Sequence, residues 1–399
     1  MEYFEELLKR ESLFKDEGKL DINYIPNKLP HRDKELSLLS QLFLGLITNP
    51  NSISRKILIT GKTGIGKTVT VKLFGRILEN VSKRRDINIR YAHVNCRKER
   101  TSYKVLIRLI QLLNSQFPKR GYSLQDLLDV LIEILNHYNI HILVVLDELS
   151  YLINKNEDLI YLLTRINDDN SNGDQRLSII GIVRDLSCLN NLDNSTMSTL
   201  QRNILKFENY SEDQIFNILK YRVEDSLKKN VLSDKLIKMI AEITSRSGDV
   251  RHGLNIIWRS CKIAESKNLK YINAECVRLG NQDLLPYSTL DVLEYMSSQK
   301  LSFLLAITKA LYNHDNIKIT FNEALKRYYM ICENIGLKPR SNSQLWNYLQ
   351  EFKKDNLLET RILSEKIKGR QTIIAIPDLS LPNLERNTIE MLNSKGFKI

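Results

Sequence analysis

Residues 56–73 read KILITGKTGIGKTVTVKL, which is a short apolar run, a glycine-rich loop and the start of an amphipathic helix. The loop fits the pattern G-x-x-x-x-G-K-[ST], in which backbone N–H groups and the positive end of the following helix cradle phosphates. We expect Lys67 to reach the β- and γ-phosphates and the hydroxyl of Thr68 to bind Mg²⁺. The loop residues predicted to bind nucleotide are Gly61, Lys62, Thr63, Gly64, Ile65, Gly66, Lys67 and Thr68.

A second apolar run, LVVLDE at residues 143–148, ends in two carboxylates. At the end of a buried strand, Asp147 would hold Mg²⁺ through water, and Glu148 would orient or activate the attacking water. An acidic turn after an ordinary strand is the alternative. The phosphate loop upstream favours the catalytic pair, so we expect a site for ATP or ADP with Mg²⁺.

Short apolar runs at residues 56–60, 87–95, 140–146 and 177–183 alternate with amphipathic helices. This alternation predicts an α/β fold with a parallel sheet covered by helices. After about Phe207 such runs stop and amphipathic helices follow. The three domains that we expect are a nucleotide-binding core at 1–206, a helical lid at 207–285 and a winged helix at 286–399.

The C-terminal segment places the turn LKPRS, residues 337–341, between two predicted helices, which suits a helix-turn-helix. Leu345, Leu349 and Phe352 share one face of the second helix, which we expect to be buried. The polar residues expected to enter a major groove are Ser343, Gln344, Asn347, Gln350 and Lys353. The residues expected on a basic β-hairpin wing are Lys366, Lys368 and Arg370. A winged helix used for protein contacts is the alternative.

The net charge is +12, and much of the excess lies in one segment. Residues 81–120 hold eleven Lys and Arg residues and only two acidic ones. Such a segment favours a polyanionic partner, with solvated surface charge as the alternative. No apolar run approaches the roughly 18 residues needed to cross a bilayer, so no membrane partner is expected. The five cysteines form no C-x-x-C pair and fit a reducing cytoplasm.

Several short motifs around the two nucleotide motifs are more selective, and they follow one another in a fixed order. They are YIP at residues 24–26, LPHR at 29–32, NCR at 95–97, LIYLLTR at 159–165, FENY at 207–210 and GDVR at 248–251. This ordered set resembles the archaeal origin-recognition and cell-division-control initiator family of AAA+ ATPases. The resemblance covers nearly the whole chain, including the C-terminal segment.

The resemblance implies roles for matching residues. Those that would border the nucleotide are Tyr24, Pro26, His31, Arg32, Tyr210, Arg222 and Arg251. Among them, Arg251 would be the lid arginine that senses the phosphates. The basic region at 95–120 matches a helical insertion that contacts DNA in the family. Its candidate DNA contacts are Arg97, Lys98, Arg100, Lys104 and Arg108.

Two positions depart from the family pattern. The family usually has Asn at the end of the fourth strand, where it helps to position water, and Arg184 stands there. It also tends to carry an Arg that acts on the ATP of a neighbouring subunit, and Ser195 stands there, with Arg202 displaced. Because a missing arginine finger costs about 10³–10⁵ in rate, we expect tight binding of ATP and slow hydrolysis by a weak ATPase.

The resemblance implies an ATP-binding replication initiator that recognises double-stranded origin DNA. It also implies a cytoplasmic protein associated with the nucleoid. Sister initiator subunits and a replicative helicase are the protein partners that it implies. One alternative is another AAA+ machine, such as a clamp loader or helicase loader. The winged helix and the N-terminal strap, by which we mean residues 24–32, argue against it. The other is a nucleotide-stabilised DNA-binding regulator without useful turnover, which the two departures favour.

Overall fold

The computed structural model describes residues 5, 11–153, 159–160, 162–163, 174–191, 197, 203–282, 287–312, 318–355, 357–365, 369–376 and 380–397. The chain forms two compact units, residues 1–254 and 255–399. Each unit is a separate body with its own core. Within the described residues, no helix is both long enough and apolar enough to span a bilayer.

The first unit is built on a five-stranded parallel sheet with strand order β2-β3-β4-β1-β5. Its strands are β1 (Lys56–Thr60), β2 (Ile89–Asn95), β3 (His141–Asp147), β4 (Leu177–Ile182) and β5 (Ile204–Lys206). The carboxyl ends of β1, β3 and β4 meet at one edge, where open parallel sheets bind ligands. The predicted α/β fold with a helix-covered parallel sheet is confirmed.

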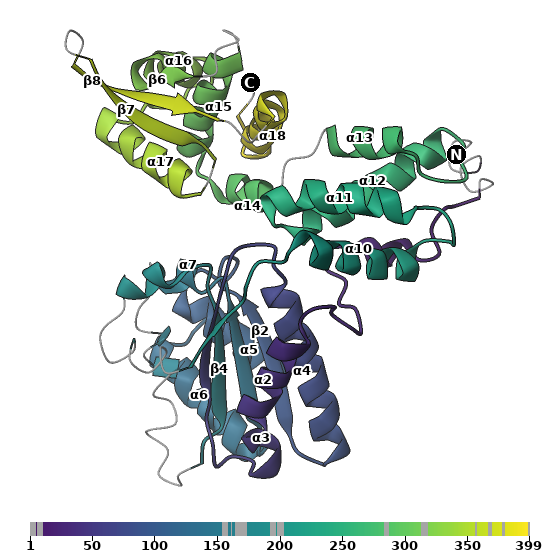
Figure 1. Cartoon of the computed structure of the whole chain (residues 1–399). Coiled ribbons are helices and arrows are strands. Elements are labelled where there is room, and N and C mark those ends of the chain that lie inside the picture. Colours follow the sequence, from purple (N-terminus) through teal and green to yellow (C-terminus); the bar gives the residue numbers. More distant parts are fainter. Residues whose placement is uncertain are drawn as a thin grey trace. The chain divides into compact units, whose positions relative to one another are not determined.

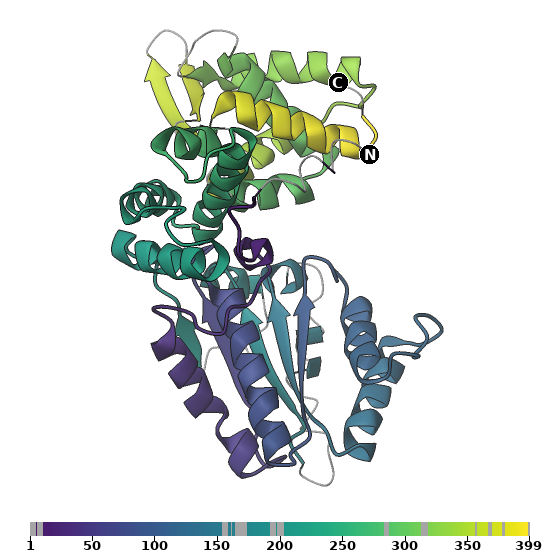
Figure 2. The same ribbon diagram turned by 90° about the vertical axis from the view of Figure 1, so that its right-hand side faces the viewer.

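Helices cover both faces of this sheet (Figures 1 and 2). One face is covered by α2 (Asp33–Phe43), α3 (Gly45–Thr48) and α4 (Lys67–Arg84). The other is covered by α5 (Ser102–Leu113), α6 (Leu124–His137), α7 (Ser150–Ile153) and the 3-10 helix η2 (Leu186–Asn191). Every residue of β3 is buried, because its alternating side chains enter both cores: Leu143 packs on the first face and Val144 on the second.

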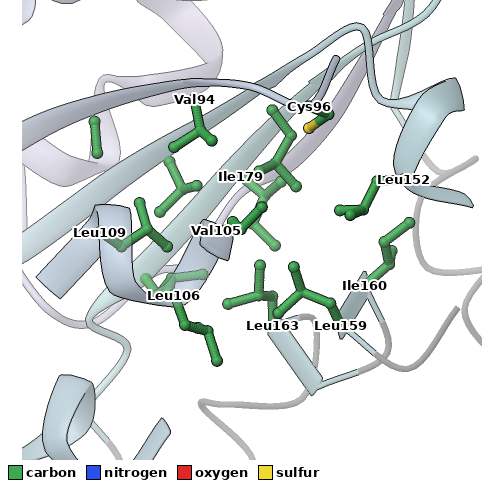
Figure 3. Packing of buried hydrophobic residues seen from close by; sticks show 14 of the residues in the cluster. Val94, Cys96, Val105, Leu106, Leu109, Leu152, Leu159, Ile160, Leu163 and Ile179 are labelled. Carbon is green, nitrogen blue, oxygen red and sulfur yellow. The ribbon is translucent and has the colours of Figure 1, made fainter. Parts of the chain in front are cut away.

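The buried residues of the core beneath α5 are aliphatic apart from one thiol, that of Cys96. Figure 3 shows Val94 and Cys96 of the β2 edge above Val105, Leu106 and Leu109 of α5. Each of these side chains is almost completely buried. This packing fixes the position of α5. The opposite face of the helix can therefore hold charged, exposed side chains.

The lid begins with α10 (Glu212–Ser226), α11 (Asp234–Ser247) and α12 (Val250–Ser266), the last of which continues into the second unit. Ser211 and Gln214 form a capping box at the start of α10, and Gly248 ends α11 in the left-handed conformation that glycine adopts at low cost. An N-terminal segment with the 3-10 helix η1 (Glu17–Leu20) runs along α10, where Phe14 pairs with Leu227.

The second unit contains the rest of α12 and a winged helix-turn-helix. Its helices are α13 (Ala274–Gln282), α14 (Tyr287–Tyr295), α15 (Ser298–Tyr312), α16 (Phe321–Asn334), α17 (Asn342–Lys354) and α18 (Leu381–Ser394). The strands β6 (Ile319–Thr320), β7 (Glu359–Glu365) and β8 (Gly369–Ala375) form an antiparallel sheet in the order β6-β8-β7. Phe303 lies at its centre, against the rings of Tyr328 and Phe352.

The sequence predicts one helix over residues 290–312, and the structure divides it in two. The side chain of Ser297 accepts a hydrogen bond from the backbone N–H of Lys300 at 3.4 Å, and the Ser297 carbonyl accepts from Leu301 at 3.0 Å. Serine in this position begins a new helix, because its hydroxyl satisfies an N–H that has no partner within the helix. The predicted continuous helix is therefore wrong at this point.

Candidate nucleotide site and nucleic-acid interface

The phosphate loop joins β1 to α4 and is stabilised by contacts that exclude larger side chains. Gly64 and Gly66 have φ values of +81° and +89°, which favour glycine. A Cβ on Gly64 would overlap the carboxyl group of Asp249, and one on Gly66 would lie 2.9 Å from the Tyr210 hydroxyl. The loop backbone thus passes directly beneath residues of the lid segment.

Lys67 is the first residue of α4 and is 8% exposed. Its Nζ donates to the carbonyls of Gly61 and Lys62 at 2.6 and 2.7 Å, so the ammonium group lies across the loop that is predicted to hold phosphates. Burial lowers the pKa of Lys67 to about 8. The carboxylates of Glu148 and Asp147 raise this pKa, but their effect is smaller than that of burial. An arriving phosphate would replace two neutral carbonyls as the partner of this charge.

The predicted metal residues lie side by side. The Thr68 hydroxyl donates to Asp147 Oδ2 at 2.9 Å, and the backbone N–H of Glu148 donates to Asp147 Oδ1 at 3.0 Å. Burial raises the pKa of Asp147, but the His93 ring and these two hydrogen bonds outweigh it and hold the pKa below its ordinary value. A hydroxyl and an ionised carboxylate are the hard oxygen donors that suit Mg²⁺, so the residues present fit that ion.

Glu148 follows β3 with a left-handed backbone, φ +55°. Its Oε2 lies 3.4 Å from Nε of Arg184, which stands two residues beyond the end of β4 and departs from the family pattern. The backbone of Arg184 also belongs to the site, because its carbonyl accepts the N–H of Gly61 at 3.3 Å. The arginine at this position therefore forms an ion pair with Glu148, the carboxylate that is predicted to activate water.

Arg251 at the start of α12 is held by its neighbour Asp249. The guanidinium donates through Nε and Nη2 to the two carboxylate oxygens of Asp249 at 3.0 and 2.8 Å. Asp249 is 1% exposed and packs on Gly64, while the N–H of Val250 donates to the Gly64 carbonyl at 3.3 Å. This arrangement places Arg251 beside the phosphate loop, where a lid arginine is expected.

Arg32 joins the N-terminal strap to the phosphate loop. Its Nη2 donates to the carbonyls of Ile65 at 2.7 Å and Glu208 at 3.0 Å, and its Nη1 pairs with Glu35 at 2.5 Å. The guanidinium also lies 4.1 Å from the centre of the Tyr210 ring. With 4% exposure, Arg32 supports the loop through these contacts, and its place at the border of the adenine stays a prediction.

We expect Arg32→Ala to lower the local stability of β1 and α4 by about 3–5 kcal/mol, because it leaves the Glu35 carboxylate and two backbone carbonyls unpaired. Hydrogen exchange of the amides in β1 and α4 measures this quantity. Lys34→Ala, at an exposed position in α2, the helix that follows Arg32, is the control and should change this stability by no more than about 0.5 kcal/mol. Equal protection in both variants would contradict the supporting role of Arg32.

The remaining strap residues surround a turn near the lid. Pro26 is buried, whereas His31 is exposed, with its Nε2 3.2 Å from Nδ2 of Asn217. The ring of Tyr24 lies 5.3 Å from the guanidinium of Arg222. These positions remain the predicted border of the adenine.

Arg222 is bound to the N-terminal segment. Its guanidinium donates to the carbonyls of Lys19 and Asp21, the latter at 3.1 Å, and it is 7% exposed. Burial lowers the pKa of Arg222. The expected nucleotide contact of Arg222 is corrected to a structural one, because its donors are already committed to the N-terminal segment that it binds to α10.

The basic insertion presents four of its five candidate residues to solvent. Lys98, Arg100, Lys104 and Arg108 are exposed. Lys104 and Arg108 lie one turn apart on α5, on the side opposite the aliphatic core. Arg97 is a correction: it is 5% exposed and its guanidinium lies 5.3 Å from the Tyr151 ring, so it is packed inside the unit and cannot reach a DNA backbone.

In the winged helix, α17 has the two faces that its sequence predicts. Leu345, Leu349 and Phe352 are completely buried. The exposed side chains are Ser343, Gln344, Asn347, Gln350 and Lys353. Lys366 and Lys368 lie outside the described residues, and for Arg370 only the backbone, in β8, is described. Ser195 and Arg202 also lie outside the described residues.

Two residues of the site were not expected from the sequence. Asp249 escapes notice because it precedes the predicted sensing arginine, and only the fold shows that it is buried on the phosphate loop. His93 lies on β2 with its Nε2 3.3 Å from Asp147 Oδ2. The sequence offers one indication of this role, which is that His93 shares a strand face with Asn95. Asn95 pairs with Asp147 in the register of β2 and β3.

Comparisons with known proteins match the sheet-based domain, the lid segment and the winged helix. Family profiles match at residues 54–184 (AAA domain), 216–282 (Cdc6 AAA+ ATPase-type lid domain) and 291–378 (CDC6, C terminal winged helix domain). The ORC1-type DNA replication protein 2 of Sulfolobus acidocaldarius is 32% identical over 386 residues, which cover 94% of this chain and 92% of that protein.

Solved structures show the same fold. The Aeropyrum pernix ORC1 protein, in a complex with DNA, superposes with a TM-score of 0.79 at 24% identity, covering 96% of this chain and 98% of that one. The Cdc6p of Pyrobaculum aerophilum superposes with a TM-score of 0.63 at 28% identity, covering 96% of this chain and 100% of that one.

Proposed function

The chain belongs to the family of ORC1-type DNA replication proteins, and from that membership we propose that it is an initiator that binds ATP and duplex origin DNA and hydrolyses ATP slowly. It has an AAA+ domain, a lid and a winged helix of the Cdc6 type. The observation that carries the nucleotide part of the proposal is the contact of Thr68 with Asp147 beside the buried Lys67.

In this proposal, Lys67 and the loop N–H groups bind the phosphates, and Thr68 and Asp147 hold Mg²⁺, which neutralises phosphate charge when bound. Arg251, held by Asp249 at the loop, senses the phosphates from the lid segment. Glu148 orients the attacking water. Sister initiator subunits and a replicative helicase are partners that the family implies for this role.

Duplex DNA is proposed to meet two surfaces. The polar face of α17 enters the major groove, and the wing contacts the backbone beside it. Lys98, Arg100, Lys104 and Arg108 form the second surface on the first unit, where exposed cations neutralise phosphates. The proposal is supported by the exposure of these side chains together with the buried apolar faces that fix α5 and α17.

We expect single-turnover hydrolysis by the wild type below about one per second, at the bottom of the usual enzyme range. The reason is that Glu148 must leave its ion pair with Arg184 to hold a water, while Ser195 supplies no charge to a neighbouring site. Glu148→Gln should abolish the residual hydrolysis without weakening ATP binding, because the amide keeps the size of the side chain. Quenched-flow assays with and without duplex DNA measure both rates.

Faster turnover would show that the two departures do no harm to the reaction. Asp129→Asn is the matched control, since Asp129 is an exposed carboxylate on α6, and it should leave the rate unchanged. If the wild type shows no turnover at all but retains nucleotide-dependent DNA binding, the regulator without useful turnover becomes the better description. The Arg184–Glu148 pair is the observation that favours that second candidate.

A further inference from the structure

His93 brings a nitrogen donor to the position where the nucleotide's cation is proposed to bind. Its Nε2 lies 3.3 Å from Asp147 Oδ2, the same oxygen that accepts the Thr68 hydroxyl at 2.9 Å. Adjacent ligands of an octahedral ion with bonds about 2.1 Å long lie about 3 Å apart. The imidazole and the hydroxyl are therefore each about as far from Asp147 Oδ2 as neighbouring ligands of one ion are from each other.

The imidazole is held in this orientation from behind. Nδ1 of His93 lies 3.2 Å from the Tyr91 hydroxyl, which can either donate to that nitrogen or accept from it. The Tyr91 ring is itself fixed, because it packs against Gly75, where any Cβ would overlap the ring, and its backbone N–H donates to Glu79 Oε1 at 3.2 Å. Without a cation, the His93 ring is a hydrogen-bond partner of the Asp147 carboxylate. With a cation between them and the ring proton on Nδ1, Nε2 would present its lone pair to the ion. Metal-ligating histidines are commonly oriented by such a partner on the other nitrogen.

The chemistry of the donors separates two kinds of divalent ion. Mg²⁺ prefers oxygen and keeps several waters, so a nitrogen donor adds little to its binding. Imidazole suits first-row transition ions, whose affinities for such sites rise from Mn²⁺ toward Cu²⁺. We propose that His93 makes the proposed nucleotide site a mixed nitrogen and oxygen site, and that it shifts the site's preference from Mg²⁺ toward a transition-metal ion such as Mn²⁺.

The inference rests on the proposed nucleotide site and concerns only the cation that enters with the nucleotide. Among the described residues, no group of three or more His, Cys, Asp and Glu side chains could hold a metal. His93 and Asp147 alone give two such donors, with Thr68 as a third, neutral one. The nucleotide's phosphates are therefore needed to complete the site, and the cation binds weakly without them.

Pulsed electron paramagnetic resonance of the full-length protein with Mn²⁺ and ADP tests this directly, because a coordinated imidazole adds ¹⁴N modulation to the manganese echo. We expect the modulation in the wild type and in His137→Gln, which changes an exposed histidine on α6. We expect its loss in His93→Gln. In ADP titrations, the ratio of the affinity with Mn²⁺ to that with Mg²⁺ should fall about tenfold in His93→Gln and remain constant in His137→Gln.

Three results would overturn the inference, and they differ from one another. If ADP and Mn²⁺ bind to the wild type but no ¹⁴N modulation appears, His93 is only a hydrogen-bond partner of Asp147. If the modulation persists in His93→Gln, its nitrogen belongs to the base or to another residue. If ADP binds with neither ion, the proposed nucleotide site fails, and the inference fails with it.

Discussion

Replacement of Lys67 by alanine should lower the affinity for ATP at least about a hundredfold, which corresponds to about 2.7 kcal/mol. The buried ammonium group is held by the carbonyls of Gly61 and Lys62, in the middle of the loop that is proposed to receive the phosphates. A charge-assisted hydrogen bond to phosphate in such a place contributes about 1.5–3 kcal/mol, and the lost Coulomb attraction adds to it. Calorimetric titration with ATP in the presence of Mg²⁺ measures the change.

Lys62→Ala is the matched control for this prediction. Lys62 belongs to the same loop and carries the same charge, but its side chain is exposed. We expect its replacement to change the ATP affinity by less than about threefold, because solvent and salt screen an exposed charge. Unchanged binding in Lys67→Ala, with a normal circular dichroism spectrum, would mean that the nucleotide binds elsewhere.

Removal of the three wing cations, Lys366, Lys368 and Arg370, should weaken binding to every duplex by about one to two orders of magnitude near 0.1 M salt. If each side chain neutralises one phosphate, the slope of log affinity against log salt should become shallower by about 2–3. Fluorescence anisotropy across a series of salt concentrations measures both quantities. The effect should be independent of sequence, since contacts to phosphate carry no base information.

Changes on α17 are the contrasting set for the same assay. Asn347→Ala and Gln350→Ala remove exposed amides from the helix that is proposed to enter the groove. They should alter the preference among duplex sequences by about 1–3 kcal/mol per lost base contact and leave the salt slope nearly unchanged. Identical behaviour of the wing and helix variants would contradict the assignment of α17 as the recognition helix.

Much of the nucleotide site could be predicted because its chemistry is local in sequence. The loop at 61–68 needs glycines at fixed spacing, and the structure shows all three of them, Gly61, Gly64 and Gly66, with positive φ. The partnership of Thr68 with Asp147 follows from the parallel sheet, since the carboxyl ends of β1 and β3 lie at the same edge, with β4 between them. The hydrogen bond at 2.9 Å brings the two side chains together, and their sharing of one metal ion stays a prediction.

The direction in which a charged side chain points could not be predicted in the same way. Arg97 and Arg222 belong to basic or nucleotide-facing patterns in the sequence, yet both guanidinium groups are buried. Long side chains reach partners that are distant in sequence, such as the Tyr151 ring or the carbonyl of Lys19. A pattern of charges along the chain contains no information about such partners.

Small elements of the second unit were missed for a related reason. The strand β6 has two residues, and it exists because Ile319 and Thr320 pair with Ile374 and Ile373 of β8. No local propensity specifies so short a strand. The helix α18 was not expected either, although Pro382 lies in its first turn and Leu384 and Leu392 enter the core of the unit.

Footprinting on DNA from the source genome, with ATP present, tests most directly whether this protein is an origin-binding initiator. We expect protection of recurring duplex sites clustered near a replication origin, at salt concentrations where unrelated duplexes are released. The same sites should lose protection in the Lys67→Ala variant if nucleotide binding and DNA binding are coupled. Uniform binding along the genome, with no recurring protected site near an origin, would contradict the account.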